Sequence, residues 1–496
     1  MISSITHTRF PRDVLCAGLF TLLIFITGCA SAPAVEEEHT GKSFDELLQP
    51  YLADPALQIA NVGIFIQDPS TRRIIYGKNQ YKLFIPASNQ KLVTTAATLT
   101  KLGDDYRFTT EIYTNGTVGN SILQGDLYIK GSGDPTLSGR FGNGNITRNL
   151  ENWADSLLSR GISTIDGDII ADPNVFDDRR IGPGWAFDDL TYWYAAEISG
   201  LSFNDNCIDV YITPGDSIGA PASLEYRPET GYVTIRNDLV TVHEDSITRM
   251  NYHRKTGTNL IRFSGRISLS DAYLKKYVTI HDPALYTATV FSNVLSSEGI
   301  TFNGDVRKIS YRDTIPEYPE MSKLIEYSSL PLSEIVSVIN RRSQNFYAEQ
   351  LFKKLGFEMV GDGSFTGGQR ALRGFLAGIG VSTEHMNVAD GSGLSRRNLI
   401  SPSQVGAVLR HMYYSPYRNT YLNSLPVGGV DGTLSNRFRG SVAIGQVRAK
   451  TGSVSFVRSL SGFVRTKDDR ELIFSVIINN HTTNRSVIDE FLRETG

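Results

Sequence analysis

Hydrophobic positions along this chain follow two spacings, and the changes of spacing mark the elements that the sequence predicts. Apolar residues every three to four positions favour helices, whereas short alternating or continuous apolar runs bounded by turn residues favour strands. Helices are predicted over Ser43–Leu57, Ile146–Ser159, Phe346–Leu355 and Ile488–Arg493. Strands are predicted within Gly63–Ile75, around the turn Pro69–Arg72, and over Val457–Val464 and Glu471–Asn479, around the turn Thr466–Asp469.

A strand-rich stretch separates the two ends of the predicted fold. From about residue 105 to about residue 320, frequent Gly, Pro and Asn turns separate short apolar runs, and helical patterns dominate from Leu330 up to the terminal strands. We interpret this stretch as an insertion into a compact domain. The expected organisation is a discontinuous domain of residues 43–105 and 320–496, with residues 106–319 inserted as an accessory region.

The N-terminal segment has the pattern of an export signal. Arg9 and Arg12 precede the apolar run Val14–Thr27, which is too short to cross a bilayer as a mature helix. The run ends in Ile26-Thr-Gly-Cys29, which looks like the recognition sequence for lipoprotein processing. We therefore expect residues 1–28 to be removed as a lipoprotein signal peptide.

Cys29 would then be the first residue and carry a lipid anchor to the membrane. Residues 29–41 contain a proline and a run of glutamates, and we interpret them as a tether. Ala30 resembles the residue found here in lipoproteins that are sorted to the outer membrane. The sequence therefore predicts a periplasmic lipoprotein, anchored in the outer membrane where the organism has one. An ordinary signal peptide, cut after Ala32 or Ala34, is the alternative.

Charge and cysteine content exclude several kinds of function. The 496 residues carry a formal net charge of −3 and no basic block, so nucleic acid is not an expected partner. Cys16 lies in the signal peptide and Cys29 would be lipidated, so no intrachain disulfide is expected and Cys207 is predicted to be buried. The sequence has no Cys/His cluster with metal spacing and no H-E-x-x-H motif, so neither a metal nor another cofactor is expected.

Ser88 and Lys91, just after Pro86, form the only Ser-x-x-Lys of the chain. Pro86 favours the start of a helix, and on a helix the hydroxyl and the amine would lie on one face, a turn apart. A lysine in that position can act as the base for a serine nucleophile. The alternative is a capping serine beside a solvated lysine, so the pair needs support from elsewhere in the chain.

Two triplets far downstream give that support. Ser343-Gln-Asn345 offers a second hydroxyl and an amide ahead of a helical run, and Lys450-Thr-Gly452 offers a cation, a hydroxyl and a residue without a side chain ahead of the closing strands. The resulting order, S-x-x-K, S-x-N and K-T-G, is the pattern of penicillin-interacting serine acyl-transferases. An edge strand carrying Lys450 can also present its backbone to an extended peptide.

Each motif has a decoy elsewhere in the sequence. Ser202-Phe-Asn204 repeats S-x-N and Lys255-Thr-Gly257 repeats K-T-G, but both lie among turn residues without a helix nearby. Gly215-Asp-Ser-Ile-Gly219 reads G-x-S-x-G, but a nucleophile elbow needs a strand before it and a helix after it, and prolines flank this segment. We therefore favour the downstream triplets and interpret the third decoy as a plain turn.

With these motifs, the chain resembles a class C low-molecular-mass penicillin-binding protein, the D-alanyl-D-alanine carboxypeptidase/endopeptidase family. Further segments similar to signatures of that family extend the resemblance from about residue 43 to the end: Gly125–Leu137, Gly184–Leu190, Ile198–Asn206, Asp390–Ser395 and Gly429–Leu434. The resemblance implies an α+β fold, with a penicillin-binding, β-lactamase-like domain built on an antiparallel sheet flanked by helices. It also implies that the insertion forms two accessory domains, one nested in the other.

The resemblance also implies roles for the first two motifs. Ser88 would be the nucleophile that attacks the carbonyl between two D-alanines. Lys91 would be the base, held neutral by burial or by the nearby charge of Lys450. Ser343 would relay the proton to the leaving amine, and Asn345 would hold the substrate amide and orient the base.

The third motif would bind the substrate. Lys450 and Thr451 would bind its terminal carboxylate, Gly452 would leave space for the acyl chain, and the backbone N–H groups of Ser88 and Ser453 would form the oxyanion hole. Peptidoglycan peptides and β-lactam antibiotics are the expected partners. The expected function is a serine D-alanyl-D-alanine carboxypeptidase with endopeptidase activity in cell-wall remodelling. A β-lactamase-like hydrolase and a non-catalytic peptidoglycan-binding lipoprotein are the alternatives.

Overall fold

The computed structural model describes residues 43–139, 141, 144–311 and 313–482. The expected signal peptide, the tether with Cys29 and the helix predicted over Ile488–Arg493 lie outside the described residues. Within the described ranges, no helix is long and apolar enough to cross a membrane.

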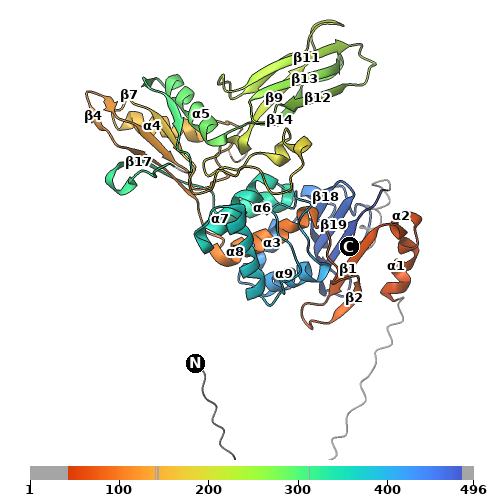
Figure 1. Cartoon of the computed structure of the whole chain (residues 1–496). Coiled ribbons are helices and arrows are strands. Elements are labelled where there is room, and N and C mark those ends of the chain that lie inside the picture. Colours follow the sequence, from red (N-terminus) through yellow and green to blue (C-terminus); the bar gives the residue numbers. More distant parts are fainter. Residues whose placement is uncertain (1–42, 140, 142–143, 312, 483–496) are drawn as a thin grey trace, which may run out of the picture. The chain divides into compact units, whose positions relative to one another are not determined.

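A five-stranded antiparallel sheet joins the two ends of the chain (Figure 1). Its strands are β1 (Asn61–Gln67), β2 (Ile74–Lys78), β18 (Val447–Val454), β19 (Val457–Arg465) and β20 (Glu471–Asn479). The order β18-β19-β20-β1-β2 pairs the first strand of the chain with the last. These bounds confirm the strand pairs predicted at both ends, and β18, which carries Lys450, is an edge strand as expected.

Helices pack on this sheet and enclose α3 in the core. They are α3 (Gln90–Leu102), α6 (Leu332–Arg342), α7 (Asn345–Val360), α8 (Phe365–Gly378), α9 (Pro402–Tyr414) and α10 (Arg418–Ser424). Leu92, Val93 and Ala96 of α3 are fully buried in one core with Phe463 and Ile473 of the sheet. Burial of this apolar surface, at about 25 cal/mol per Å², is the main term that holds α3 in place.

The helix predicted over Ser43–Leu57 is divided in two. α1 spans Phe44–Leu52 and α2 spans Pro55–Gln58. Pro55 occupies the first position of α2, where a missing backbone N–H costs no intrahelical hydrogen bond, and it disfavours helical geometry in the residue before it. The helix predicted over Phe346–Leu355 is confirmed within α7.

Between α3 and α6 the described chain forms four further sheets. Two of them are β16-β8-β6-β3-β17 and β15-β7-β5-β4, with strands β3 (Thr109–Thr114), β4 (Thr117–Gly119), β5 (Ile122–Gln124), β6 (Leu127–Lys130), β7 (Thr164–Asp166), β8 (Ile169–Asp172), β15 (Thr301–Phe302), β16 (Val306–Lys308) and β17 (Ser322–Ser328). The other two are β10-β9-β14 and β11-β13-β12, with strands β9 (Cys207–Thr213), β10 (Ser223–Arg227), β11 (Thr234–Val242), β12 (Arg249–Arg254), β13 (Leu260–Ser268) and β14 (Leu274–Thr279).

A second core belongs to this strand-rich region. Helix α4 (Arg148–Ser159), which confirms the helix predicted there, and α5 (Pro283–Ser297) pack on it. Cys207 is fully buried, as predicted. The helices and mostly antiparallel sheets confirm the α+β class. The expected boundaries at residues 105 and 320 stay predictions, and β17, which pairs with β3, begins just after the second of them.

Candidate active site

The turn that carries Ser88 lies directly before α3. Ser88 occupies a single 3₁₀ turn, Ala87–Asn89 (η1), so it precedes the α-helix instead of lying on it as the spacing predicted. Lys91 is still one turn away, and its Nζ lies 3.0 Å from Ser88 Oγ. The N-cap of α3 is Asn89. Ser88 is therefore not the capping serine that the alternative interpretation required.

The amine of Lys91 is fully buried among three hydrogen-bond acceptors. Besides Ser88 Oγ, Nζ contacts Asn345 Oδ1 at 2.6 Å and the carbonyl oxygen of Ser392 at 2.7 Å. The amine of Lys91 therefore contacts Ser88, Asn345 of the second motif and the loop that contains Ser392.

Burial is the main cause that sets the protonation of Lys91. It lowers the pKa of Lys91 to about 7, while the charges of Glu349 and Asp390 act in the opposite direction. Lys450 and Lys91 also repel each other when both are charged, as we expected, and this repulsion acts on the pKa of Lys450. Burial lowers the pKa of Lys450 itself well below its usual value, and the charge of Lys91 lowers it further.

Ser343 and Asn345 lie at the junction of α6 and α7. Ser343 ends α6 in a left-handed conformation, with φ 58° and ψ 39°, and Asn345 begins α7. The Nδ2 of Asn345 donates to the carbonyl oxygen of Tyr194 at 2.7 Å, so its Oδ1 faces Lys91. The orientation of the amide is therefore fixed from both ends.

The third motif lies on the edge strand β18, beside η1. Lys450 is buried, and its Nζ donates to Ser343 Oγ at 2.8 Å and to the carbonyl oxygen of Thr451 at 2.7 Å. The hydroxyl of Thr451 donates to that of Thr433 at 2.8 Å. The structure thus brings all three sequence motifs into one cluster.

The structure gives a reason for a glycine at position 452 that the sequence did not suggest. A Cβ at this position would lie 2.1 Å from Ser459 Oγ, 2.9 Å from the carbonyl oxygen of Pro86 and 3.1 Å from the backbone nitrogen of Ser88. The missing side chain lets β18 approach the turn of the nucleophile candidate. The expected role in leaving space for an acyl chain stays a prediction.

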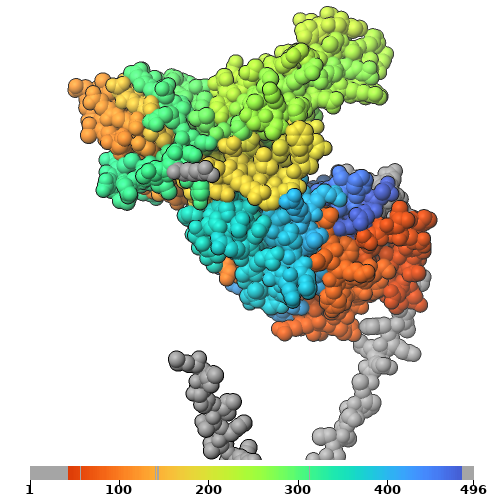
Figure 2. Space-filling view, viewed as in Figure 1, coloured from red at the N-terminus to blue at the C-terminus, as the bar shows by residue number. Residues whose placement is uncertain are grey.

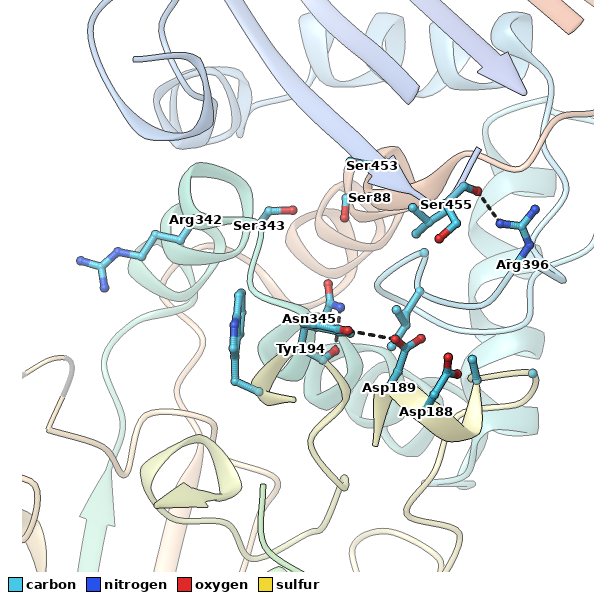
Figure 3. A pocket seen from close by; sticks show the side chains of 16 residues that line it. Ser88, Asp188, Asp189, Tyr194, Arg342, Ser343, Asn345, Arg396, Ser453 and Ser455 are labelled. Carbon is cyan, nitrogen blue, oxygen red and sulfur yellow. Dashed lines mark hydrogen bonds between the residues drawn. The ribbon is translucent and has the colours of Figure 1, made fainter. Parts of the chain in front are cut away.

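A cavity of about 430 Å³ opens at this cluster (Figure 3). Ser88, Ser343, Asn345 and Ser453 line it together with residues of the strand-rich region. Figure 3 shows Asp188, Asp189 and Tyr194 of that region across from Ser88, with Ser455 and Arg396 on the side of Ser88. The expected oxyanion-hole residues Ser88 and Ser453 therefore border one cavity.

A buried glutamate next to Lys91 was missed by the motif analysis. Glu349 is fully buried on α7, and its carboxylate accepts the backbone N–H groups of Gly391 at 2.9 Å and Ser392 at 2.8 Å. Burial, together with the charge of Asp390, raises the pKa of Glu349 to about 8. Its place four residues after Asn345, on the same helix face, is the sequence signal that could have identified it.

Asp390 organises the loop that presents the Ser392 carbonyl. Its carboxylate accepts the backbone N–H groups of Gly393 at 2.8 Å and Ser395 at 2.6 Å. Trp185 Nε1, from the strand-rich region, donates to the same carboxylate at 2.9 Å. The Asp390–Ser395 segment therefore connects that region to Lys91.

The decoy motifs lie outside the cluster. Ser202 is buried, and its Oγ donates to the carbonyl oxygen of Ser199 at 3.0 Å. Lys255–Gly257 form the exposed turn between β12 and β13, and Gly215–Gly219 form a turn between β9 and β10 without a helix. In the part of the chain that the structure describes, no group of His, Cys, Asp or Glu side chains could hold a metal ion.

Known proteins are similar in sequence to this chain over most of its length. The profile of the D-Ala-D-Ala carboxypeptidase 3 (S13) family matches residues 45–494. A D-alanyl-D-alanine carboxypeptidase of Actinomadura sp. (strain R39) is 34% identical over 481 residues, which cover 94% of this chain and 87% of that protein. The D-alanyl-D-alanine carboxypeptidase DacB of Haemophilus influenzae is 28% identical over 436 residues, 86% of each chain.

A solved structure shares the fold. The crystal structure of penicillin binding protein 4 (dacB) from Haemophilus influenzae matches with a TM-score of 0.78 and 25% identity, covering 90% of this chain and 97% of that chain. This likeness confirms the predicted penicillin-binding fold. The chain belongs to the D-Ala-D-Ala carboxypeptidase 3 (S13) family and is a class C low-molecular-mass penicillin-binding protein.

Proposed function

We propose that this serine-type D-Ala-D-Ala carboxypeptidase acts through an acyl-enzyme on Ser88, and that it also cleaves the D-alanyl crosslinks of peptidoglycan as an endopeptidase. The observation that carries the proposal is the set of contacts around the amine of Lys91. Asn345 Oδ1 and the Ser392 carbonyl can only accept hydrogen bonds, so a neutral amine donates both of its N–H groups to them. Its lone pair then points at the Ser88 hydroxyl, 3.0 Å away.

The acylation step follows from this orientation. Lys91 removes the proton of Ser88 as Oγ attacks the carbonyl carbon between the two D-alanines. The backbone N–H groups of Ser88 and Ser453 stabilise the oxyanion, and losing one such donor typically raises a barrier by about 2.7–4 kcal/mol. Ser343 passes a proton to the leaving amine as the C–N bond breaks, and water then hydrolyses the ester.

The substrate is held by its C-terminal carboxylate. Lys450 and Thr451 lie side by side on β18, where an extended peptide can pair with the edge of the sheet. A carboxylate at this place stabilises the ammonium form of Lys450, which burial alone disfavours. Farther along the cavity, Asp189 and Arg396 supply opposite charges for polar groups of the peptide.

The relatives support the binding of β-lactams, which would acylate Ser88 by opening their ring. The protein from Haemophilus influenzae is named penicillin binding protein 4. A relative from Dictyostelium discoideum, 30% identical over 448 residues, which cover 84% of this chain and 82% of that protein, is named penicillin-sensitive carboxypeptidase A. The lipobox-like sequence before Cys29 supports a periplasmic lipoprotein that remodels the cell wall.

The test is covalent labelling of the soluble chain, residues 42–496, with a fluorescent penicillin, alongside D-alanine release from a D-Ala-D-Ala peptide and conversion of crosslinked peptidoglycan fragments into monomers. We expect a long-lived adduct on Ser88, found by mass spectrometry of the labelled peptide, and loss of both activities in Ser88→Ala. Ser202→Ala, in the decoy motif, is the matched control and should label normally.

Other results would select the alternatives. Rapid turnover of penicillin without a lasting adduct would indicate a β-lactamase-like hydrolase. Binding to peptidoglycan without hydrolysis by the wild type, unchanged in Ser88→Ala, would indicate a binding lipoprotein. Incorporation of a fatty-acid probe by the full chain, lost in Cys29→Ser, tests the lipid anchor.

A further inference from the structure

The sheet β11-β13-β12 has one buried and one exposed face. Ile261, Phe263 and Ile267 of β13 are fully buried in the second core. Successive side chains of a strand alternate between faces, so Arg262 and Arg266 point to the opposite side, and both are exposed. In Figure 1 the three strands are labelled, and in Figure 2 they belong to the yellow-green surface.

Basic side chains gather on this outer face. The strand register aligns Arg236 with Arg262 and His253, and it places Arg249 directly opposite Arg266. All of these side chains are exposed, and we call them the arginine face. The whole chain carries a net charge of −3, so the face differs in sign from the molecule that bears it.

The charge of the arginine face is only partly neutralised. Asp238 lies 3.1 Å from Arg236 and 2.5 Å from Arg262. Among the described residues, no carboxylate lies within ion-pair distance of Arg249 or Arg266. Like charges directly opposite each other destabilise a sheet. A ligand that brings carboxylates or other anionic groups to this pair removes the repulsion.

One edge of the arginine face adjoins the wall of the active-site cavity. The hydroxyl of Thr191 lies 3.4 Å from His253 Nδ1, and Tyr192 packs edge-on against Tyr252 of β12, with ring centroids 5.2 Å apart. Asp188 and Asp189 before this pair, and Trp193 and Tyr194 after it, line the cavity. The same short segment therefore borders the cavity and supports the sheet.

We propose that the arginine face binds the carboxylates of peptide stems that neighbour the stem being cleaved, so that the enzyme recognises polymeric peptidoglycan. The inference rests on the proposed function, because it extends the same site. Guanidinium groups bind carboxylates through two parallel hydrogen bonds. Stems repeat along a glycan strand, so several weak contacts act together and raise the effective concentration of the strand at the cavity.

The test is cosedimentation with insoluble sacculi that have been freed of protein and of phosphate-bearing polymers. We expect Arg249→Gln/Arg266→Gln to bind about two- to thirtyfold more weakly than the wild type, given about 0.2–1 kcal/mol for each exposed charge pair. Sacculi with amidated carboxylates should bind both proteins equally weakly. Arg72→Gln/Arg73→Gln, at an exposed turn before β2, is the control with the same charge change.

Labelling by penicillin and hydrolysis of a small D-Ala-D-Ala peptide show that each variant is folded and active, and both should be unchanged. Equal binding by variant and wild type, or an equal loss in the control, would overturn the inference. Loss of binding to phosphatidylglycerol vesicles, with binding to sacculi retained, would assign the face to a membrane surface instead. A wild type that binds sacculi through these arginines but hydrolyses no peptide would leave the inference standing and contradict the proposed function.

Discussion

Lys91 is a buried amine whose contacts suit both of its protonation states. As an ammonium it donates to Ser88 Oγ, Asn345 Oδ1 and the Ser392 carbonyl, and as an amine it donates to the last two and accepts from Ser88. Both states are satisfied without a rearrangement. The proton can therefore move between serine and lysine with little cost in reorganised hydrogen bonds.

The pKa of Lys91 predicts the pH dependence of acylation. Burial lowers this pKa to about 7, and the amine is a base only when it is neutral, so the rate of penicillin labelling should rise about tenfold per pH unit below 7 and level off above it. Labelling rates measured under subsaturating penicillin from about pH 5 to about pH 9 check this. A rate that does not change across that range would exclude Lys91 as the base.

The sequence could predict the residues that carry distinctive side chains, but not the contacts that tune them. Ser88, Lys91 and Lys450 stand in short contiguous motifs. The Ser392 carbonyl has no side-chain signature, and in sequence Glu349 resembles any solvated helix glutamate. The crowding around Gly452 could not be predicted either, because it depends on segments that only the folded chain brings together.

At the scale of single elements, α7 links the candidate site to its supporting loop. Asn345 in its first turn contacts Lys91, and Glu349 one turn later holds the backbone of Gly391 and Ser392. Glu349 is therefore a positioning residue. It orients a carbonyl that Lys91 contacts, and its charge raises the pKa of that lysine.

Replacing Glu349 with glutamine should move the pH profile of acylation in a defined direction. Because burial raises the pKa of Glu349 to about 8, the carboxyl is only partly ionised where Lys91 titrates. Glutamine removes that partial charge, so the pKa of Lys91 falls and the rising limb of the labelling rate should shift slightly to lower pH. A purely structural role would lower the rate at every pH without moving the limb. Glu358→Gln, on the exposed end of α7, is the control and should leave the profile in place.

The contact between β18 and η1 predicts the effect of a single methyl group. Gly452→Ala should slow penicillin labelling more than tenfold, because the new Cβ meets Ser459 Oγ and the Pro86 carbonyl and pushes the edge strand from Ser88. Overpacking of this kind costs about 1–3 kcal/mol of unfolding free energy, so the protein should still fold.

Labelling kinetics and urea unfolding of the same preparation separate the two effects of Gly452→Ala. Adding Ser459→Ala removes the nearest clash and should restore part of the rate, while the contact with Pro86 remains. Unchanged labelling in the single variant would mean that β18 tolerates displacement.

Local patterns predicted single elements better than their pairing. Short apolar runs on either side of turn residues identified β1, β19 and β20, which are buried along most of their length. Local patterns could not predict that β11 pairs with β13 in parallel. β12 lies between them in sequence, and consecutive strands usually form antiparallel hairpins.

At the scale of the whole molecule, α7 also connects the two hydrophobic cores through buried polar contacts. Asp205 of the strand-rich region accepts hydrogen bonds from Gln344 Nε2 and from the hydroxyl of Tyr347, each at 2.9 Å. Lys353, fully buried, is paired with Asp177 at 2.6 Å. Removing the inserted region would take these partners away from Gln344, Tyr347 and Lys353.

Asp205→Ala should therefore destabilise the whole protein. It removes the acceptor of two buried donors, at a typical cost of about 1–3 kcal/mol each, and it puts alanine at a left-handed position with φ 56°. Asp205→Asn keeps one acceptor and tolerates that backbone, so it should be affected less. Chemical unfolding of the two variants checks this order, and equal stabilities would show that this contact contributes little.

The strand order β18-β19-β20-β1-β2 determines at which stage of its synthesis the chain can become active. A ribosome makes the chain from its N-terminus, so Ser88 and Lys91 emerge long before Lys450, and β1 must wait for β20, the last strand that the structure describes. A growing chain holds the nucleophile without the strand that completes its cleft. The enzyme is therefore inactive until β20 has been synthesised, and a β-lactam labels only chains that contain this strand.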